Sequence, residues 1–86
     1  MSIKTGQQAT TTSAAPLPAA SITSGPVTLK APSSNAAPIE IGGSGVTVGT
    51  GFVMNPGDLV QVSVQNLSNL YLIGANTSDK ITWIGI

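Results

Sequence analysis

Residues 55–64, Asn-Pro-Gly-Asp-Leu-Val-Gln-Val-Ser-Val, join a tight turn to the clearest strand in the chain. Proline presets φ at the second position of the turn, and Gly57 permits the positive φ that a type II turn requires at the third. Beyond the turn, apolar and polar residues alternate, so Val60, Val62 and Val64 are predicted to face a core. This pattern is typical of a β-strand with one buried face.

The other segments after residue 26 have the same character. Short β-branched runs are separated by Gly, Pro, Asn and Asp, and we expect strands at 27–31, 38–42, 46–48, 52–54, 70–73 and 80–86. Residues 66–69 are predicted to form a turn with Leu67 beneath it. Six to eight short strands without helical periodicity predict an all-β fold, either a small β-sandwich or a jelly-roll-like barrel.

The first 24 residues differ in composition from the rest. Of 22 Val, Ile, Leu and Phe residues, only Ile3, Leu17 and Ile22 precede Val27. So few apolar side chains do not offset the entropy of ordering the segment, and its prolines disfavour a helix. We therefore predict an extended N-terminal arm over residues 1–24 and a β-sandwich body over residues 25–86. No apolar run is long enough to predict a signal peptide or a transmembrane helix.

Composition argues against most chemistry. The 86 residues carry three lysines and three carboxylates, with zero formal net charge and no Arg, His or Cys. A zinc site needs His or Cys, and a serine nucleophile here would have only lysine as its base. Zero net charge gives no electrostatic footprint for nucleic acid or an anionic membrane. We expect no catalytic residue, cofactor, metal site or small-molecule substrate.

Two motifs invite functional interpretations that the residues do not support. The glycine-rich stretch 42–51 lacks the Gly-Lys-Ser/Thr ending of a phosphate-binding loop, and no helix is predicted after it. Turns and β-bulges explain its glycines better. Glu40, Asp58 and Asp79 lie far apart in the sequence and beside turns, which disfavours a carboxylate pair or a calcium site.

The low charge instead favours association with other protein. Only 7% of the residues are charged, whereas roughly a quarter is usual. With a small core and no disulfide, the remaining source of stability is oligomerisation or packing on a larger partner. The candidate interface residues are Ala14, Leu17, Pro18 and Ile22 of the arm, Ser44 and Thr47 of the glycine-rich loop, and Tyr71 and Trp83, whose polar tips suit an interface.

Several runs, taken in order, carry a resemblance that covers about residues 21–86. They are Val-Thr-Leu-Lys-Ala at 27–31, Pro-Ile-Glu-Ile-Gly-Gly-Ser-Gly-Val-Thr at 38–47, Pro-Gly-Asp at 56–58, Asn-Leu-Ser-Asn-Leu-Tyr-Leu-Ile-Gly at 66–74 and Trp-Ile-Gly at 83–85. Together they resemble short tailed-bacteriophage structural proteins with a small β-sandwich body, some of which are capsid decoration, or cement, proteins.

The resemblance implies a virion protein made in the host cytoplasm. As a decoration protein it would bind the major capsid protein on the outer capsid surface, as a homo-oligomer for which a trimer is favoured. The alternative is a tail, baseplate or fibre component, including a host-recognition module. A small enzyme or ligand-binding protein is the third hypothesis, and the composition described above argues against it.

Overall fold

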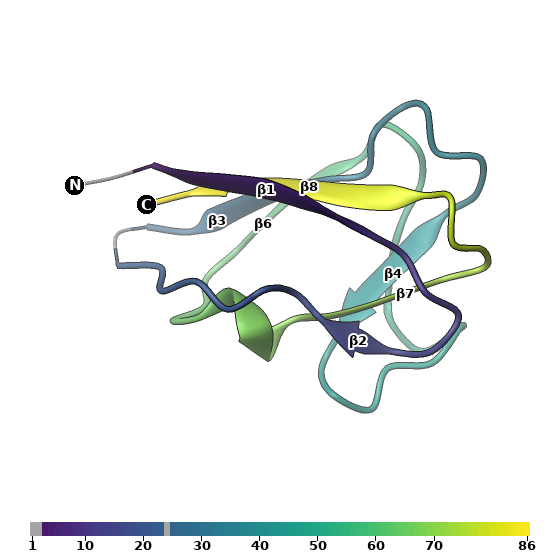
Figure 1. Ribbon diagram of the computed structural model, residues 1–86, viewed down its shortest axis with the longest axis horizontal. Coiled ribbons are helices and arrows are strands. Elements are labelled where there is room, and N and C mark those ends of the chain that lie inside the picture. The colour runs from purple at the N-terminus through teal and green to yellow at the C-terminus, as the bar shows by residue number, and fades with distance from the viewer. Residues whose placement is uncertain (1–2, 24) are drawn as a thin grey trace.

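The computed structural model describes residues 3–23 and 25–86, which form two four-stranded antiparallel sheets packed face to face (Figure 1). The first sheet has the order β1-β8-β3-β6 and the second has the order β2-β7-β4-β5. The strands are β1 (Lys4–Ala9), β2 (Ala15–Pro16), β3 (Val27–Lys30), β4 (Ile39–Gly42), β5 (Phe52–Met54), β6 (Leu59–Val62), β7 (Tyr71–Gly74) and β8 (Lys80–Gly85). A single 3-10 turn, η1 (Leu67–Asn69), precedes β7. The predicted all-β sandwich is confirmed.

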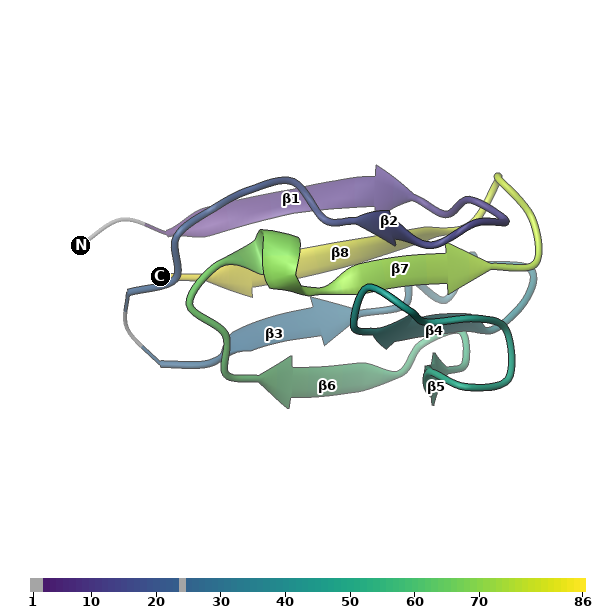
Figure 2. The same cartoon turned by 90° about the horizontal axis from the view of Figure 1, so that it is seen from below.

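The strand pairing is nested. Strand β1 pairs with β8, β2 with β7, β3 with β6 and β4 with β5, while β3–β8 and β4–β7 pairs complete the two sheets. Consecutive strands therefore alternate between the sheets over most of the chain, as Figure 2 shows. This is the arrangement of a long hairpin rolled into two layers, so the sandwich is a jelly roll.

The core lies between the sheets and is built from the inward side chains of each strand. Val60, Val62 and Val64 pack against it as predicted, each half-buried. Leu72 and Ile73 are both buried although they point to opposite faces of β7, which confirms a strand covered on both sides. The buried cluster comprises Leu17, Ile22, Val27, Leu29, Ala31, Ile39, Ile41, Met54, Leu67, Leu72, Ile81 and Trp83.

The predicted turns are present. The Asp58 N–H donates to the Asn55 carbonyl over 2.9 Å, and Gly57 has φ of +93°, the conformation for which glycine was required. Leu67 is fully buried at the start of η1. The Asn66 side-chain oxygen caps this turn by accepting from the Ser68 N–H.

The described residues do not show the predicted division into an arm and a body. All six residues of β1 pair with β8, β2 pairs with β7, and Leu17 and Ile22 belong to the core. Residues 3–23 thus contribute an edge strand to each sheet, and Met1, Ser2 and Ser24 lie outside the described residues. The polar composition of this segment did not predict its strands, because the inward positions of an edge strand need not be apolar when a large side chain from the neighbouring strand covers them.

The predicted strand at 46–48 is also absent. These residues lie in a loop that folds back over β4, so Val46 is buried against Gly42 and Gly51 while Val48 is 64% exposed. The reason is the Glu40 side chain, which points away from the core as predicted and holds this loop in place.

Candidate interaction surface

The Glu40 carboxylate is buried beneath the glycine-rich loop. Its two oxygens accept the Gly49 N–H at 3.0 and 2.9 Å, and one of them also accepts the Gly51 N–H at 2.9 Å. Backbone N–H groups that converge on a carboxylate compensate the loss of its hydration. Glu40 therefore organises the loop and does not face a solvent-filled site.

The other two carboxylates, Asp58 and Asp79, also accept hydrogen bonds from backbone N–H groups. Asp58 accepts the Asn55 N–H at 2.8 Å within the turn before β6. Asp79, 2% exposed, accepts the Ala36 N–H at 2.7 Å and the Ala37 N–H at 3.2 Å, and so ties two loops together. All three carboxylates have structural roles, and no group of three metal-ligating side chains occurs in the described residues.

The lysines, by contrast, all lie on strands of the first sheet: Lys4 on β1, Lys30 on β3 and Lys80 on β8. Leu29 and Ile81 point into the core, so the alternation of side chains places Lys30 and Lys80 on the outer face. Lys30 and Lys80 thus place ammonium groups on the outer face of this sheet, whereas Glu40 and Asp79 are buried elsewhere and Asp58 is exposed in the turn before β6.

Two rows of side chains cross this outer face. The strand register aligns Thr5, Ile84, Thr28 and Gln61 in one row, and Gln7, Thr82, Lys30 and Leu59 in the next. None of these residues is acidic. Leu59 and Ile84 are large apolar side chains that remain 64% and 49% exposed. We call these eight residues, with Ala9 and Lys80, the outer face.

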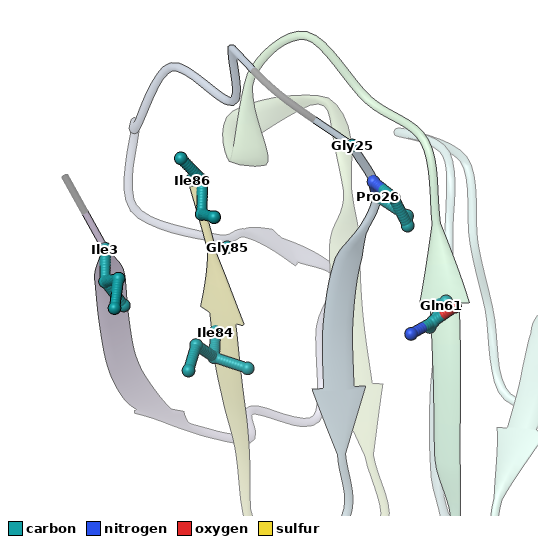
Figure 3. Close-up of a pocket in the computed structure, with 7 residues that line it drawn as sticks. All are labelled: Ile3, Gly25, Pro26, Gln61, Ile84, Gly85 and Ile86. Carbon is teal, nitrogen blue, oxygen red and sulfur yellow. The ribbon is translucent and has the colours of Figure 1, made fainter. Parts of the chain in front are cut away.

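An open groove of about 360 Å³ lies at one end of the outer face. Figure 3 shows the side chains that line it, which come from the ends of neighbouring segments of one sheet. Most of the side chains that line the groove are apolar. Ile3 precedes β1, Pro26 precedes β3, and Ile84 and Ile86 lie at the end of the chain. Gln61 of β6 contributes a polar carboxamide group to the lining. The groove suits an apolar side chain from another protein.

Further exposed apolar residues occur near the edge of the second sheet. Val48, Phe52 and Val53 are 64%, 57% and 49% exposed, and they lie in or just after the loop that Glu40 holds. Ser44 and Thr47 of the predicted interface are exposed in the same loop. Thr47 and Thr50 hydrogen-bond to each other there, through the Thr47 N–H at 2.8 Å.

The structure separates the predicted interface residues into two groups. Leu17, Ile22 and Trp83 are at most 8% exposed and belong to the core, so they are not available to a partner in this fold. Their prediction as interface residues is corrected for this reason. Ala14 and Tyr71 are half-buried, and Pro18, Ser44 and Thr47 are exposed. None of these five lies on the outer face.

The outer face itself was not identified from the sequence. The pattern that could indicate it lies in the last strand, where the outward residues Thr82 and Ile84 alternate with the inward residues Ile81 and Trp83. Since all four residues favour strands, the sequence does not reveal which pair points inward until the sheet partners are known.

No helix in the described residues is long and apolar enough to cross a membrane. Comparisons with protein-family models, curated proteins and solved structures gave no match to this chain.

Proposed function

We propose that this chain is a non-enzymatic structural protein of a bacteriophage virion, and specifically a capsid decoration protein that binds the major capsid protein on the outer surface of the shell. The observation that carries the proposal is the outer face of the first sheet. It combines exposed Leu59 and Ile84, an apolar groove and polar uncharged side chains, while the carboxylates are engaged in internal hydrogen bonds.

This face is suited to stable contact with protein. Threonine and glutamine side chains lose less hydration free energy on burial than charged ones, so covering these positions of the face costs less than covering charged ones. Ile84 and the groove beside it supply the apolar burial that drives association. Lys30 and Lys80 favour a partner surface that carries carboxylates and disfavour a basic one.

The fold is compatible with this function. Jelly rolls occur in viral capsid proteins and also in lectins, so the fold alone does not distinguish these roles. The resemblance of residues 21–86 to small phage virion proteins favours a role in the virion. As a decoration protein, the chain would associate with other copies as well as with the shell, and a trimer is the favoured arrangement.

Binding to undecorated, expanded capsids of the same phage tests the proposal. Ile84→Asn places an uncharged polar group beside the groove, and Val53→Asn is its matched control because both side chains are 49% exposed on outward positions of different sheets. We expect Ile84→Asn to weaken capsid binding at least about tenfold, because a polar group would be buried in place of an apolar contact, and Val53→Asn to bind normally. Equal binding by the two variants would remove the outer face from the proposal.

The number of copies in each virion distinguishes the capsid from the tail. Decoration of a shell predicts copies of the order of hundreds, because every capsomer junction repeats the site. A tail, baseplate or fibre component would be present in far fewer copies. Quantitative mass spectrometry of purified virions, referenced to the major capsid protein, gives this number.

A further inference from the structure

The two sheets end in four edge strands, and β1 is the longest of them. It has six residues, whereas β2, β5 and β6 have two, three and four. Its register with β8 runs without interruption from Lys4 to Ala9, so it contains no bulge, and it contains no proline. Bulges, prolines and charged side chains, lysine above all, are features by which edge strands commonly avoid pairing with other chains, and of these β1 has only Lys4, at its first position.

One hydrogen bond shows which backbone groups of β1 face outward. The Thr10 N–H donates to the Asp79 carbonyl over 2.9 Å, and this pair continues the register of β1 with β8. In antiparallel sheets, directly bonded pairs alternate with non-bonded ones. The backbone groups of Lys4, Gly6 and Gln8 therefore face β8, and those of Thr5, Gln7 and Ala9 face the open edge.

We propose that β1 pairs with β1 of a second copy of this chain, antiparallel, about a two-fold axis that passes beside Gln7. In this register Gln7 lies opposite Gln7 of the second copy, Thr5 lies opposite the second copy's Ala9, and Ala9 lies opposite its Thr5. These three pairs are directly bonded, so each outward N–H and C=O group gains a partner. The two first sheets become one eight-stranded sheet.

Charge is compatible with this register and disfavours those that bring the two Lys4 residues together. Lys4 is the single charged residue of β1 and lies opposite Thr10 of the second copy, so the two Lys4 side chains are about 20 Å apart along the strands. That separation exceeds the Debye length of about 8 Å at physiological salt. Registers that bring the two Lys4 residues together place like charges opposite each other, which is unfavourable.

The pairing also makes the outer face continuous across the two copies. Thr5, Gln7 and Ala9 belong both to the free edge and to the outer face, so the rows of one copy extend into those of the other. The symmetry is two-fold, which differs from the trimer favoured for a decoration protein. The inference concerns the protein alone in solution and does not depend on the proposed capsid function.

Single cysteines test the pairing, because the natural chain has none. Directly bonded residues in antiparallel strands have Cα atoms about 5.5 Å apart, within the range that a disulfide spans. We expect Gln7→Cys to form a covalent dimer in a glutathione redox buffer. Gln61→Cys is the matched control, since Gln61 is also an exposed outer-face residue, on the edge strand at the opposite side of the same sheet.

Sedimentation equilibrium of the chain without cysteine substitutions gives a second, independent readout. We expect the unsubstituted chain to dimerise, Gln7→Lys to raise the dimer Kd at least about tenfold because two ammonium groups meet at the axis, and Gln61→Lys to leave the Kd unchanged. High salt should reduce the effect of Gln7→Lys. Circular dichroism verifies that each variant is folded.

Three results would overturn the inference. The first is a monomeric unsubstituted chain at about 1 mM, where even weak pairing is populated. The second is equal crosslinking of Gln7→Cys and Gln61→Cys, which indicates random collision. The third is crosslinking that requires a mixture of the two variants, which indicates that β1 pairs with β6 of another copy.

Discussion

Gly6 of β1 lies directly against the indole ring of Trp83 on the neighbouring strand β8. A Cβ atom at position 6 would fall 2.6 Å from Cζ2 and 3.0 Å from Cε2 of the ring. The two residues are paired in the strand register, and Trp83 is only 8% exposed. Because Gly6 has no side chain, the Trp83 ring occupies the space beside it, and this contact packs the N-terminal segment against the rest of the fold.

Gly6→Ala should therefore destabilise the protein. Replacing glycine by alanine usually favours folding by about 0.4–1 kcal/mol where the backbone allows it, through the unfolded state. Here the added methyl group would overlap the ring, and overpacking typically costs about 1–3 kcal/mol. Urea denaturation measures the difference. Gly43→Ala is the control, because no atom lies within 4 Å of its Cβ position, and it should be neutral or slightly stabilising.

The docking of residues 3–23 predicts that Leu17 contributes strongly to stability. Leu17 is 1% exposed and belongs to the core, so Leu17→Ala should lower the free energy of unfolding by about 2–5 kcal/mol. Pro18 is exposed, and Pro18→Ala should change the free energy of unfolding by no more than about 0.5 kcal/mol. Thermal or urea unfolding measures the stability of both variants. Equal, small effects would show that this segment is a separate arm after all.

Glu40→Gln should loosen the glycine-rich loop. The amide retains the shape of the side chain but places an NH₂ group against backbone N–H groups that now meet carboxylate oxygens. We expect hydrogen exchange at the Gly49 and Gly51 amides to accelerate by about tenfold, as for a charge-assisted bond worth roughly 1.5 kcal/mol. The Asp58 amide, which donates to the Asn55 carbonyl, is the internal reference and should exchange at its original rate.

Asn35→Ala should lower the free energy of unfolding more than most substitutions of polar residues. The Asn35 amide donates to the Lys80 carbonyl at 2.8 Å and accepts from the Lys80 N–H at 3.0 Å, and it thereby takes the place of a strand residue at the end of β3. Its removal leaves both Lys80 groups unpaired, at a cost of about 1–3 kcal/mol. Asn69 is exposed, so Asn69→Ala should be near neutral in the same unfolding assay.

Local patterns in the sequence predicted much of the sandwich. The Asn55–Asp58 turn, the buried Leu67 and the alternation around Glu40 follow from backbone sterics and the period of a strand, and the structure contains all three. These features depend only on neighbours within a few residues. Such positions are predictable because the physical cause lies inside the segment.

The errors have non-local causes. Strand β1 shows no apolar alternation, since its inward position at Gly6 is filled by Trp83, a residue 77 positions later in the chain. Val46–Val48 resembles a strand, but the hydrogen bonds of Gly49 and Gly51 to Glu40 fold it into a loop. The outer face likewise depends on which strands become neighbours, which no single segment specifies.

The most direct test of the proposed adhesive role is an image reconstruction of the intact phage particle at a resolution that traces this chain. We expect the jelly roll on the outside of the capsid shell, with Ile84, Lys30 and the groove covered by the major capsid protein. Density for the chain in the tail would contradict the decoration role. A chain on the capsid with its outer face open to solvent would contradict the interface.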